Sequence, residues 1–374
     1  MFLKRVLFLT NYPSPYRVQF FDELGKHMDV TVLFSDRIEA KKHRSASWFV
    51  NSEGHFRVVQ LTKRLFTLKG RDLCWDVTAW LKKDYDAIVV CGYSTPTILL
   101  AMAYMRLKKI PFYMEMDGGL IRRDSRWKLW LKRKLVGCAD SWISSGRYTT
   151  EYLVHYGAKP EKVYPYPFSS LREAELLERP VTQEEKQQLR RDLGLGEKKL
   201  ILTIGQFIHR KGFDILLKAA AHTSTDAVIC FVGGEPTEEY LQLQKELSLE
   251  NVRFLGFMKK EELIRYYQAA DLFVLPTRED IWGLVINEAM AYGLPVITTD
   301  RCVAGLELVE DGVNGCIVPV KDAAVLAEKM NELLAADTAA MGAASLEKVR
   351  EYTIEGMVRA HKDIFENHPI RSLQ

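Results

Sequence analysis

Paired cysteines, clustered histidines and long apolar runs are all scarce in this sequence. The six cysteines among 374 residues stand far apart, with no Cys-x-x-Cys pair and no histidine cluster beside them. This excludes a disulfide framework and a structural zinc site. We expect buried free thiols in a reducing cytosol instead. The cysteines are Cys74, Cys91, Cys138, Cys230, Cys302 and Cys316.

No segment has the pattern of a leader or a membrane span. The apolar run after Lys4 and Arg5 is too short for a signal peptide. The longest uncharged window, residues 87–105, is interrupted by Gly-Tyr-Ser-Thr-Pro at 92–96, which favours a strand followed by a helix over a span. The first half also lacks the G-x-G-x-x-G fingerprint of nicotinamide dehydrogenases. A cytoplasmic protein, at most peripheral on a membrane, is expected.

The remaining composition is that of a globular protein, with 47% hydrophobic and 27% charged residues. Its length favours two domains. The net charge of +3 is unevenly divided, because residues 1–165 have 28 Lys/Arg against 16 Asp/Glu and the rest has 24 against 33. The basic first half is therefore expected to meet an anion: nucleic acid, a phosphorylated substrate or an anionic membrane surface.

Short apolar runs alternate with helical patterns along the whole chain. The runs are continuous rather than alternating, which is typical of parallel strands buried on both faces. Strands are expected at 5–10, 29–35, 55–61, 87–92, 111–117 and 141–145, and again at 199–205, 227–234, 251–257, 271–277, 294–299 and 315–320. Helices are expected between them, including 17–27, 71–83, 97–109, 213–222, 238–247, 261–268 and 284–292.

This alternation predicts an α/β protein with two Rossmann-like, doubly wound domains facing a central cleft. The first domain is placed at residues 1–165 and the second at 166–350, with the link near the two prolines of Tyr164–Pro167. Residues 351–374 are expected to form a helix that packs back on the first domain. Ligands of such sheets bind beyond the carboxyl ends of the strands, so residues there are the candidates for function.

A basic turn follows the strand at 199–205. Gly205 and Gly212 enclose Arg210 and Lys211, and a helix is expected from Phe213. Backbone amides at a helix start together with two positive charges suit a diphosphate. A solvated Arg-Lys pair in an ordinary loop explains the turn equally well.

A second segment, residues 278–296, follows the strand at 271–277. Gly283 lets the backbone approach a ligand, and the next helix begins with free amides at Leu284 and Val285. Glu288 lies one turn into that helix and can accept hydrogen bonds from ribose hydroxyls in the same pocket. A surface glutamate is the weaker interpretation, because the flanking residues are largely apolar.

The segment PTREDIWGLVINEAMAYGLPVITT resembles the signature of the retaining GT-B glycosyltransferases of family four, the group 1 glycosyltransferases. Two acidic residues separated by seven others mark that family, and here they are Asp280 and Glu288. FLTNYPSPYRVQFFDELGK, GQFIHRKG, VGGEP, VRFLGFMKKEELIRYYQAADLFVLPT and DGVNGCIVP are similar to further landmarks in the expected order. Two positions depart from the pattern: Asp280 replaces the usual Glu, with Glu279 as a competitor, and Gln206 stands where Arg is frequent.

The resemblance implies a nucleotide-sugar site in the second domain. Its members are Gly205, Arg210 and Lys211 at the donor diphosphate, Gly283, Leu284 and Val285 at the distal phosphate, Glu288 at the ribose, Phe257 and Met258 at the base, and Asp280 at the transferred sugar. Arg210, Lys211 and Asp280 are the catalytic candidates on this side.

The first domain is expected to supply the acceptor side. Arg17 follows the first strand, and Asp117, with Glu115 as second choice, follows the strand at 111–117. Family members often carry a histidine or an acidic group near the reacting sugar in this region. The alternative for Asp117 is a turn cap before Gly118.

The implied activity is transfer of a sugar, a hexose first, from a nucleotide-diphosphate sugar to a glycan or lipid-linked glycan with retention of anomeric configuration, in cell-surface polysaccharide biosynthesis. UDP is the commonest carrier in the family. No cofactor beyond this co-substrate is expected, and no metal, because the Asp84-Tyr85-Asp86 motif precedes a strand. A nucleotide-sugar epimerase of the same fold and a catalytically silent nucleotide-sugar-binding subunit stay open as alternatives.

Residues 121–135 carry seven Lys/Arg and one Asp. Trp127, Trp130, Leu131 and Leu135 share one face of the expected helix. Such a face predicts either an interfacial helix on an anionic membrane or a helix that packs its apolar stripe on the core. The pattern alone favours neither. Nucleic acid is not expected, given the predicted donor pocket.

Overall fold

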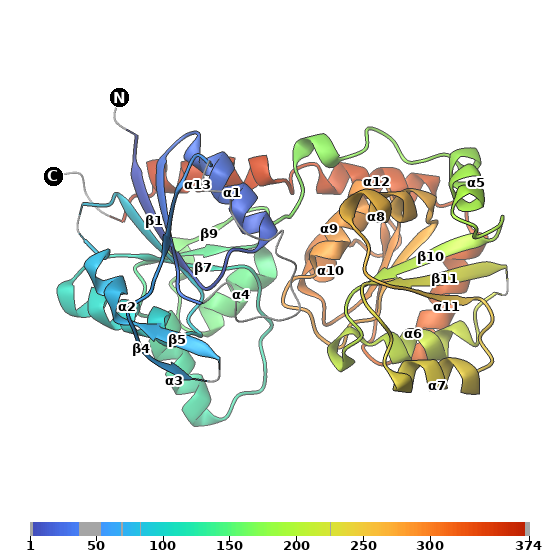
Figure 1. Cartoon of the computed structure of the whole chain (residues 1–374), viewed down its shortest axis with the longest axis horizontal. Helices are drawn as coiled ribbons and strands as arrows, with labels where there is room; N and C mark the ends of the chain where they lie inside the picture. Colours follow the sequence, from blue (N-terminus) through green and yellow to red (C-terminus); the bar gives the residue numbers. More distant parts are fainter. Residues whose placement is uncertain (1–2, 37–53, 69, 83, 225, 371–374) are drawn as a thin grey trace. The chain divides into compact units, whose positions relative to one another are not determined.

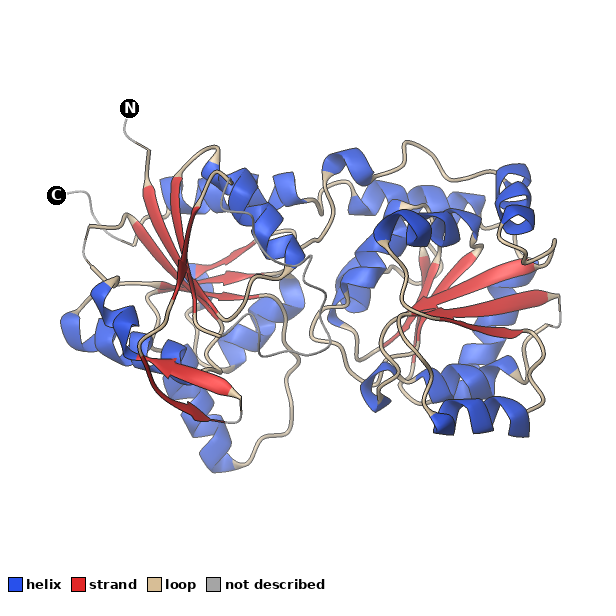
Figure 2. Cartoon of the chain, in the orientation of Figure 1, coloured by secondary structure: helices blue, strands red, loops and turns tan. Residues whose placement is uncertain are grey.

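The computed structural model describes residues 3–36, 54–68, 70–82, 84–224 and 226–370. The chain divides into two compact units, residues 1–170 with 353–374 and residues 171–352. Both units have the α/β architecture with parallel sheets that the sequence predicts (Figures 1 and 2).

The first unit contains a seven-stranded sheet in the order β3-β2-β1-β6-β7-β8-β9. Its paired strands are all parallel. From β1 the chain adds β2 and β3 on one side and later returns to add β6 on the other. The carboxyl ends of β1 and β6 therefore flank a topological switch point, where open α/β sheets bind ligands. The strands are β1 (Arg5–Thr10), β2 (Asp29–Phe34), β3 (Arg57–Gln60), β6 (Ala87–Cys91), β7 (Tyr113–Met116), β8 (Ser141–Ser144) and β9 (Val163–Pro165).

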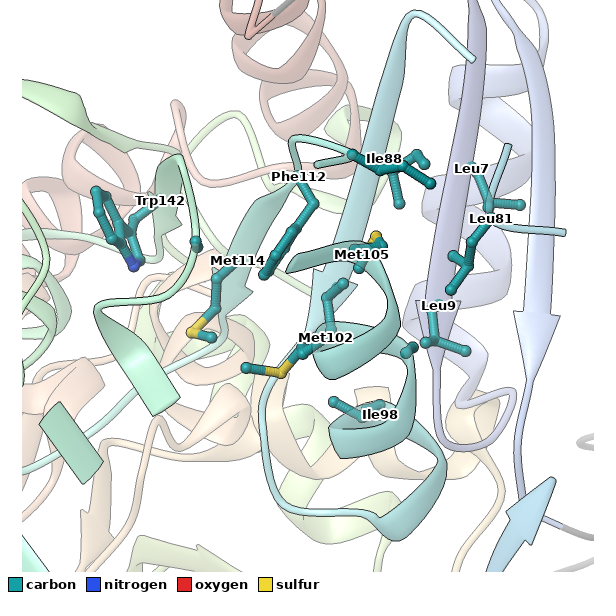
Figure 3. Close-up of a cluster of buried hydrophobic side chains, with 14 of the residues drawn as sticks. Leu7, Leu9, Leu81, Ile88, Ile98, Met102, Met105, Phe112, Met114 and Trp142 are labelled. Carbon is teal, nitrogen blue, oxygen red and sulfur yellow. The ribbon is translucent and has the colours of Figure 1, made fainter. Parts of the chain in front are cut away.

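Helices cover both faces of this sheet, which is why its central strands are largely apolar. Leu7 and Leu9 of β1 join a buried cluster with α2 (Figure 3), while Phe8, between them, meets Phe20 of α1 and Phe365 of α13. α13 lies beside α1 within this unit (Figure 1), so the end of the chain completes its core. The helices are α1 (Pro15–Gly25), α2 (Pro96–Lys108), α3 (Arg126–Val136), α4 (Arg147–His155) and α13 (Ile354–Asn367).

The prediction of a helix at 71–83 is wrong. Here β4 (Arg64–Leu68) and β5 (Arg71–Cys74) form an antiparallel hairpin, followed by the short 3-10 helix η3 (Trp75–Ala79). The hydroxyl of Thr97 on α2 accepts a hydrogen bond from the amide of Cys74 at 2.9 Å and donates one to the carbonyl of Asp72 at 2.7 Å. These tertiary bonds fix the extended backbone and override the helical spacing.

The second unit has a six-stranded parallel sheet in the order β12-β11-β10-β13-β14-β15. Its switch point lies between β10 and β13. The strands are β10 (Lys199–Ile204), β11 (Ala227–Val232), β12 (Val252–Leu255), β13 (Leu272–Leu275), β14 (Val296–Thr299) and β15 (Gly315–Val318). The helices are α5 (Gln183–Asp192), α6 (Phe213–Ala220), α7 (Glu238–Glu246), α8 (Lys260–Ala269), α9 (Leu284–Ala291), α10 (Val303–Leu308), α11 (Ala323–Ala335) and α12 (Ala339–Val349).

Among the described residues, none of the helices combines the length and the apolar character needed to cross a bilayer. The same residues contain no group of three or more His, Cys, Asp or Glu placed to hold a metal ion. Asp84 forms an ion pair with Arg5 at 3.0 Å, on the amino side of β6. All six cysteines are free thiols, and burial raises the pKa of Cys302 to about 12.

Candidate functional site

The turn after β10 depends on one glycine. Residues His209–Lys211 form a single 3-10 turn, and Gly212 then takes a left-handed conformation with φ of 70° before α6 begins at Phe213. A Cβ at Gly212 would lie 2.1 Å from the carbonyl oxygen of Pro276. Only glycine lets this turn pack against the loop that follows β13.

Side chains of the loop after β13 bind the loop after β10 and the start of α6. Arg278 forms a two-pronged ion pair with Asp214, at 2.7 and 2.6 Å, and donates to the carbonyl of His209 at 2.8 Å. Thr277 donates to the carbonyl of Arg210 at 2.9 Å. Burial alone would raise the pKa of Asp214, but the Arg278 hydrogen bonds hold it below its ordinary value. The loops after β10 and β13 thus form one unit at the switch point.

Three of the predicted charges meet in these loops. Arg210 Nη1 lies 3.0 Å from Asp280 Oδ1, and Lys211 Nζ lies 2.6 Å from Asp280 Oδ2. The cluster of two cations and one carboxylate keeps a net positive charge, which suits an anion. Glu279, the competing acidic residue, faces Arg301 instead, at 3.4 Å. The lysine stem passes over Gly205, where a Cβ would be 3.3 Å from Lys211 Cε.

The start of α9 lies beside this cluster. Gly283 has φ of 112°, and a Cβ there would be 2.8 Å from the sulfur of Cys302 and 3.8 Å from Asp280 Cγ. Within the described residues no side chain caps α9. By helix geometry its first amides, at Leu284 and Val285, point outward along the axis, as an anion site requires. Asp280 and the start of α9 are therefore close neighbours.

Glu288 lies one turn further along α9 and is half-buried. The hydroxyl of Tyr267 on α8 donates to Glu288 Oε2 at 2.8 Å. Tyr267 is itself buried and stacks on Tyr292 with ring centres 5.2 Å apart. Sequence reasoning missed Tyr267, for which no motif gives a signal. Phe257, after β12, is 81% exposed, and Met258 beside it is half-buried.

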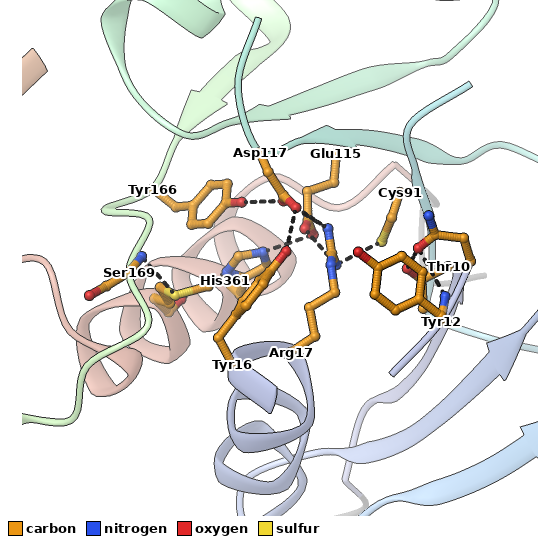
Figure 4. Close-up of polar contacts among 12 residues, drawn as sticks. Thr10, Tyr12, Tyr16, Arg17, Cys91, Glu115, Asp117, Tyr166, Ser169 and His361 are labelled. Carbon is orange, nitrogen blue, oxygen red and sulfur yellow. Dashed lines mark hydrogen bonds and ion pairs between the residues drawn. The ribbon is translucent and has the colours of Figure 1, made fainter. Parts of the chain in front are cut away.

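In the first unit, Arg17 anchors a cluster of polar residues at the β1/β6 switch point (Figure 4). Its Nη2 lies 2.7 Å from both carboxylate oxygens of Asp117, and its Nη1 lies 3.2 Å from Glu115 Oε1 and 3.2 Å from the sulfur of Cys91. We call this group the Arg17 cluster; its members are Tyr16, Arg17, Cys91, Glu115, Asp117, Tyr166 and His361.

Burial separates the two predicted carboxylates. The Glu115 side chain is only 2% exposed, whereas that of Asp117 is 21% exposed and reaches the surface. Tyr16 and Tyr166 also donate to Asp117, at 3.1 and 3.0 Å. Burial alone would raise the pKa of Glu115, but the charge of Arg17 holds it below its ordinary value. Asp117 is therefore the member of the pair that can meet a ligand.

Four members of the Arg17 cluster were not predicted as site residues, and one of them, Cys91, was expected only as a buried thiol. Tyr16 lies next to Arg17 in the sequence, so the motif around Arg17 could have indicated it. Tyr166 and His361 come from distant segments, and His361 belongs to α13 at the other end of the chain.

Residues 185–355, which contain the second sheet and the Arg210 loop, match the family described as glycosyl transferases group 1. Through this second unit, the chain is similar to the group 1 glycosyltransferases. The match confirms the resemblance carried by the segment around Asp280 and Glu288.

Curated relatives match part of this chain. The D-inositol 3-phosphate glycosyltransferase of Corynebacterium diphtheriae is 32% identical over 238 residues, which are 59% of this chain and 55% of that protein. The chain thus spans about half the length of the curated relatives it matches.

Solved structures resemble this chain over both units. The Anabaena protein HepE in complex with UDP has a TM-score of 0.77 at 19% identity, covering 97% of this chain and 100% of that one. WaaG, a glycosyltransferase involved in lipopolysaccharide biosynthesis, has a TM-score of 0.64 at 17% identity, covering 96% and 99%. These likenesses establish the GT-B fold that the sequence predicts.

Helix α3 of the first unit exposes most of its aromatic face. Trp127 is 68% exposed and stacks on Trp130, itself 49% exposed, with ring centres 4.8 Å apart; Leu131 is also exposed. The prediction that this stripe packs on the core is therefore wrong for these three residues. The inner face of α3 uses Leu129 and Val136 instead.

Proposed function

We propose that this chain transfers a hexose from a UDP-sugar to a glycan or lipid-linked glycan acceptor, with retention of anomeric configuration. The observation that carries the proposal is the Arg210–Lys211–Asp280 cluster beside the start of α9, at the switch point of the second sheet. The UDP bound to the structurally similar HepE supports the choice of carrier.

The cluster explains how the leaving group is stabilised. As the bond from the anomeric carbon to the diphosphate breaks, negative charge grows on the distal phosphate. Arg210, Lys211 and the first amides of α9 are cationic or dipolar donors that favour this charge. The new bond to the acceptor oxygen forms on the same face, and the acceptor proton passes to the leaving phosphate. No carboxylate nucleophile is needed in this scheme.

Asp280 and Glu288 complete the donor side. Asp280 shares Arg210 and Lys211 with the incoming diphosphate and contacts the transferred sugar. Glu288, oriented by Tyr267, accepts hydrogen bonds from the ribose hydroxyls. Phe257 and Met258 border the base; the open position of Phe257 leaves its ring available for stacking.

On the acceptor side we place Asp117 and Arg17. Asp117 is the exposed carboxylate of the Arg17 cluster and contacts the acceptor hydroxyls. Glu115 is buried beneath it and supports Arg17 rather than touching substrate.

We further propose that α3 docks on an anionic membrane. Exposed Trp127 and Trp130 supply interfacial aromatic rings, and charged residues flank them. Each Lys or Arg near such a surface contributes about 1 kcal/mol. Asp124 pairs with Lys128 and Lys132. Other basic residues of the segment are exposed and can meet lipid headgroups; they include Arg123, Arg126 and Lys134.

Docking of this kind suits a lipid-linked acceptor, in keeping with the lipopolysaccharide role of WaaG. It places the enzyme at the cytoplasmic leaflet, whose surface is negatively charged.

The donor proposal is tested by thermal unfolding with a panel of nucleotide sugars, since a ligand that binds the folded state raises the midpoint. A UDP-sugar should raise it most. Lys211→Ala should lower turnover by about 10²–10³-fold, whereas Lys218→Ala, an exposed lysine of α6, should not. Turnover of Lys211→Ala within a few-fold of wild type contradicts the assignment, and conversion of the donor sugar without acceptor favours the epimerase.

The membrane proposal is tested by co-sedimentation with vesicles. Binding should need anionic lipid, weaken with salt and fall strongly in the double variant Trp127→Ser, Trp130→Ser. Leu107→Ser, at an exposed site on α2, is the control. Equal binding to neutral vesicles, or none at low salt, refutes docking through α3.

A further inference from the structure

His361 is a buried titratable group for which the proposed transfer reaction assigns no task. It belongs to α13, its side chain is fully buried, and aromatic rings surround it. The ring centres of Phe20, Tyr166, Phe365 and Phe8 lie 4.7, 4.8, 5.9 and 6.4 Å from that of His361. Burying an imidazole among aromatic rings costs free energy unless its nitrogens are hydrogen-bonded, whereas an apolar side chain would pack there without that cost. We therefore expect the polar contacts of His361 to have a role.

The two ring nitrogens have different partners. Nδ1 lies 2.8 Å from the carbonyl oxygen of Met357, which can only accept, so Nδ1 carries a hydrogen. Nε2 lies 3.3 Å from Glu115 Oε2 (Figure 4). A neutral ring with its single hydrogen on Nδ1 would direct a lone pair at this carboxylate. A second proton must therefore lie between Nε2 and Glu115.

The surroundings place that proton on the histidine. The other oxygen of Glu115 already accepts from Arg17 at 3.2 Å, which favours the ionised carboxylate. Arg17 on α1 and Asp117 after β7 are the other charged members of the cluster, and Tyr16, Tyr166 and Cys91 are its neutral titratable members. With a charged His361, two cations face two carboxylates, and the buried cluster is neutral.

We propose that His361 is an imidazolium in the folded protein and is a positioning residue for Asp117. It holds Glu115 Oε2, so that Glu115 Oε1 fixes one arm of Arg17 while the other arm grips both oxygens of Asp117. Without it, Glu115 loses a donor and draws the guanidinium away from Asp117. Through this relay the last helix of the chain sets the geometry of a carboxylate near its beginning. Only the catalytic consequence rests on the proposed function.

The charge is tested by nitrogen NMR of the imidazole rings in the full-length protein. At neutral pH both nitrogens of His361 should give the protonated signature, while exposed His222 serves as the internal reference. A spectrum with one protonated and one bare nitrogen overturns the proposal. This measurement needs no substrate, so its outcome is independent of whether the chain transfers a sugar.

The positioning role is tested by two variants. His361→Gln keeps a donor for Glu115 without the charge, and His361→Leu keeps neither. We expect kcat to fall about tenfold and about 100-fold respectively, a loss typical of a displaced reacting group, while the KM for donor stays within twofold. Where His361→Leu does not fold, as judged by circular dichroism, His361→Gln and the NMR result decide. Wild-type kcat in His361→Gln, or a fall matched by a rise in donor KM, overturns the relay.

Discussion

Asp280 lies where the two cations Arg210 and Lys211 converge, so a diphosphate bound as proposed would compete with Asp280 for them. Its two oxygens are engaged by Arg210 and Lys211 at 3.0 and 2.6 Å. A carboxylate this close to a phosphate site weakens phosphate binding and at the same time keeps the cations ordered.

The first prediction concerns this competition. Asp280→Asn should bind UDP about tenfold more tightly, a change of ~1.4 kcal/mol, because the cations lose their internal partner, yet it should turn over more slowly. Calorimetric titration with UDP and steady-state assays measure the two effects. Glu279→Gln, whose carboxylate faces Arg301, is the matched control and should change neither by more than twofold. Weaker UDP binding in Asp280→Asn would show that the carboxylate helps rather than competes.

The second prediction concerns the tyrosine behind Glu288. Tyr267→Phe removes the hydrogen bond to Glu288 Oε2 and should weaken UDP binding by about 1 kcal/mol, roughly fivefold. Tyr266→Phe, the neighbouring position on α8, is the control. An unchanged affinity in Tyr267→Phe would mean that Glu288 needs no such support.

The charges of the donor loops were accessible from the sequence because they directly follow predicted strands. Arg210, Lys211 and Asp280 are all placed in that way. Tyr267 and His361 were not accessible, since each acts through a partner on another element, 21 and 246 residues away. No spacing rule connects such pairs before the chain is folded.

Among the elements, the turn before α6 is tightly constrained. Gly212 combines a left-handed backbone with a carbonyl oxygen 2.1 Å from any added Cβ. Gly194 has nearly the same φ, 68°, but open space around it. Substituting Gly194 therefore measures the free-energy cost of a left-handed backbone alone, and substituting Gly212 adds the cost of the steric clash.

The third prediction uses this pair. Gly194→Ala should lower the free energy of unfolding by about 1–2 kcal/mol, the cost of a left-handed alanine. Gly212→Ala should cost at least ~2 kcal/mol more and should weaken UDP binding, because the loops after β10 and β13 must separate. Urea unfolding monitored by circular dichroism measures both. Equal losses of unfolding free energy in the two variants would mean that the loop relieves the clash at Gly212 at no cost in stability.

Continuous apolar runs identified the sheet strands well, because parallel strands buried on both faces leave that signal. The segment 71–83 shows where the signal misleads: Leu73, Val77 and Trp80 have helical spacing, but Thr97 and the pairing of β4 with β5 decide the backbone. Likewise, the aromatic stripe of α3 was visible in the sequence, but whether it faced the core depended on how α3 docks on its unit.

At the scale of the whole molecule, each unit repeats one plan, a parallel sheet with a switch point and a charged cluster there. Composition and alternation sufficed to predict two such units. The exact membership of each unit depends on long-range packing, and the structure assigns residues 353–374 to the first.

The fourth prediction concerns acid. The pKa values of Asp22, Asp84, Glu115 and Asp124 are lowered in the first unit, and those of Glu185 and Asp214 in the second. In each case the unfolded chain binds more protons, so the stabilisation is present above the ordinary carboxyl pKa of about 4 and is lost as the pH falls below it.

Because buried Glu115 and strongly bonded Asp124 both belong to the first unit, we expect that unit to open first on acidification. Hydrogen exchange read by peptide mass spectrometry resolves the two units. Asp124→Asn should flatten the acid dependence of the first unit, since Lys132 and Tyr156 then lose their ionised partner. Earlier opening of the second unit would contradict the expectation.

The return of α13 to the first unit also dictates an order of events during synthesis. Phe8 meets Phe365, and Phe20 meets His361, only after the entire second unit has left the ribosome. The first unit is thus begun first and completed last, and its nascent sheet must wait, with part of one apolar face uncovered, for residues 353–374.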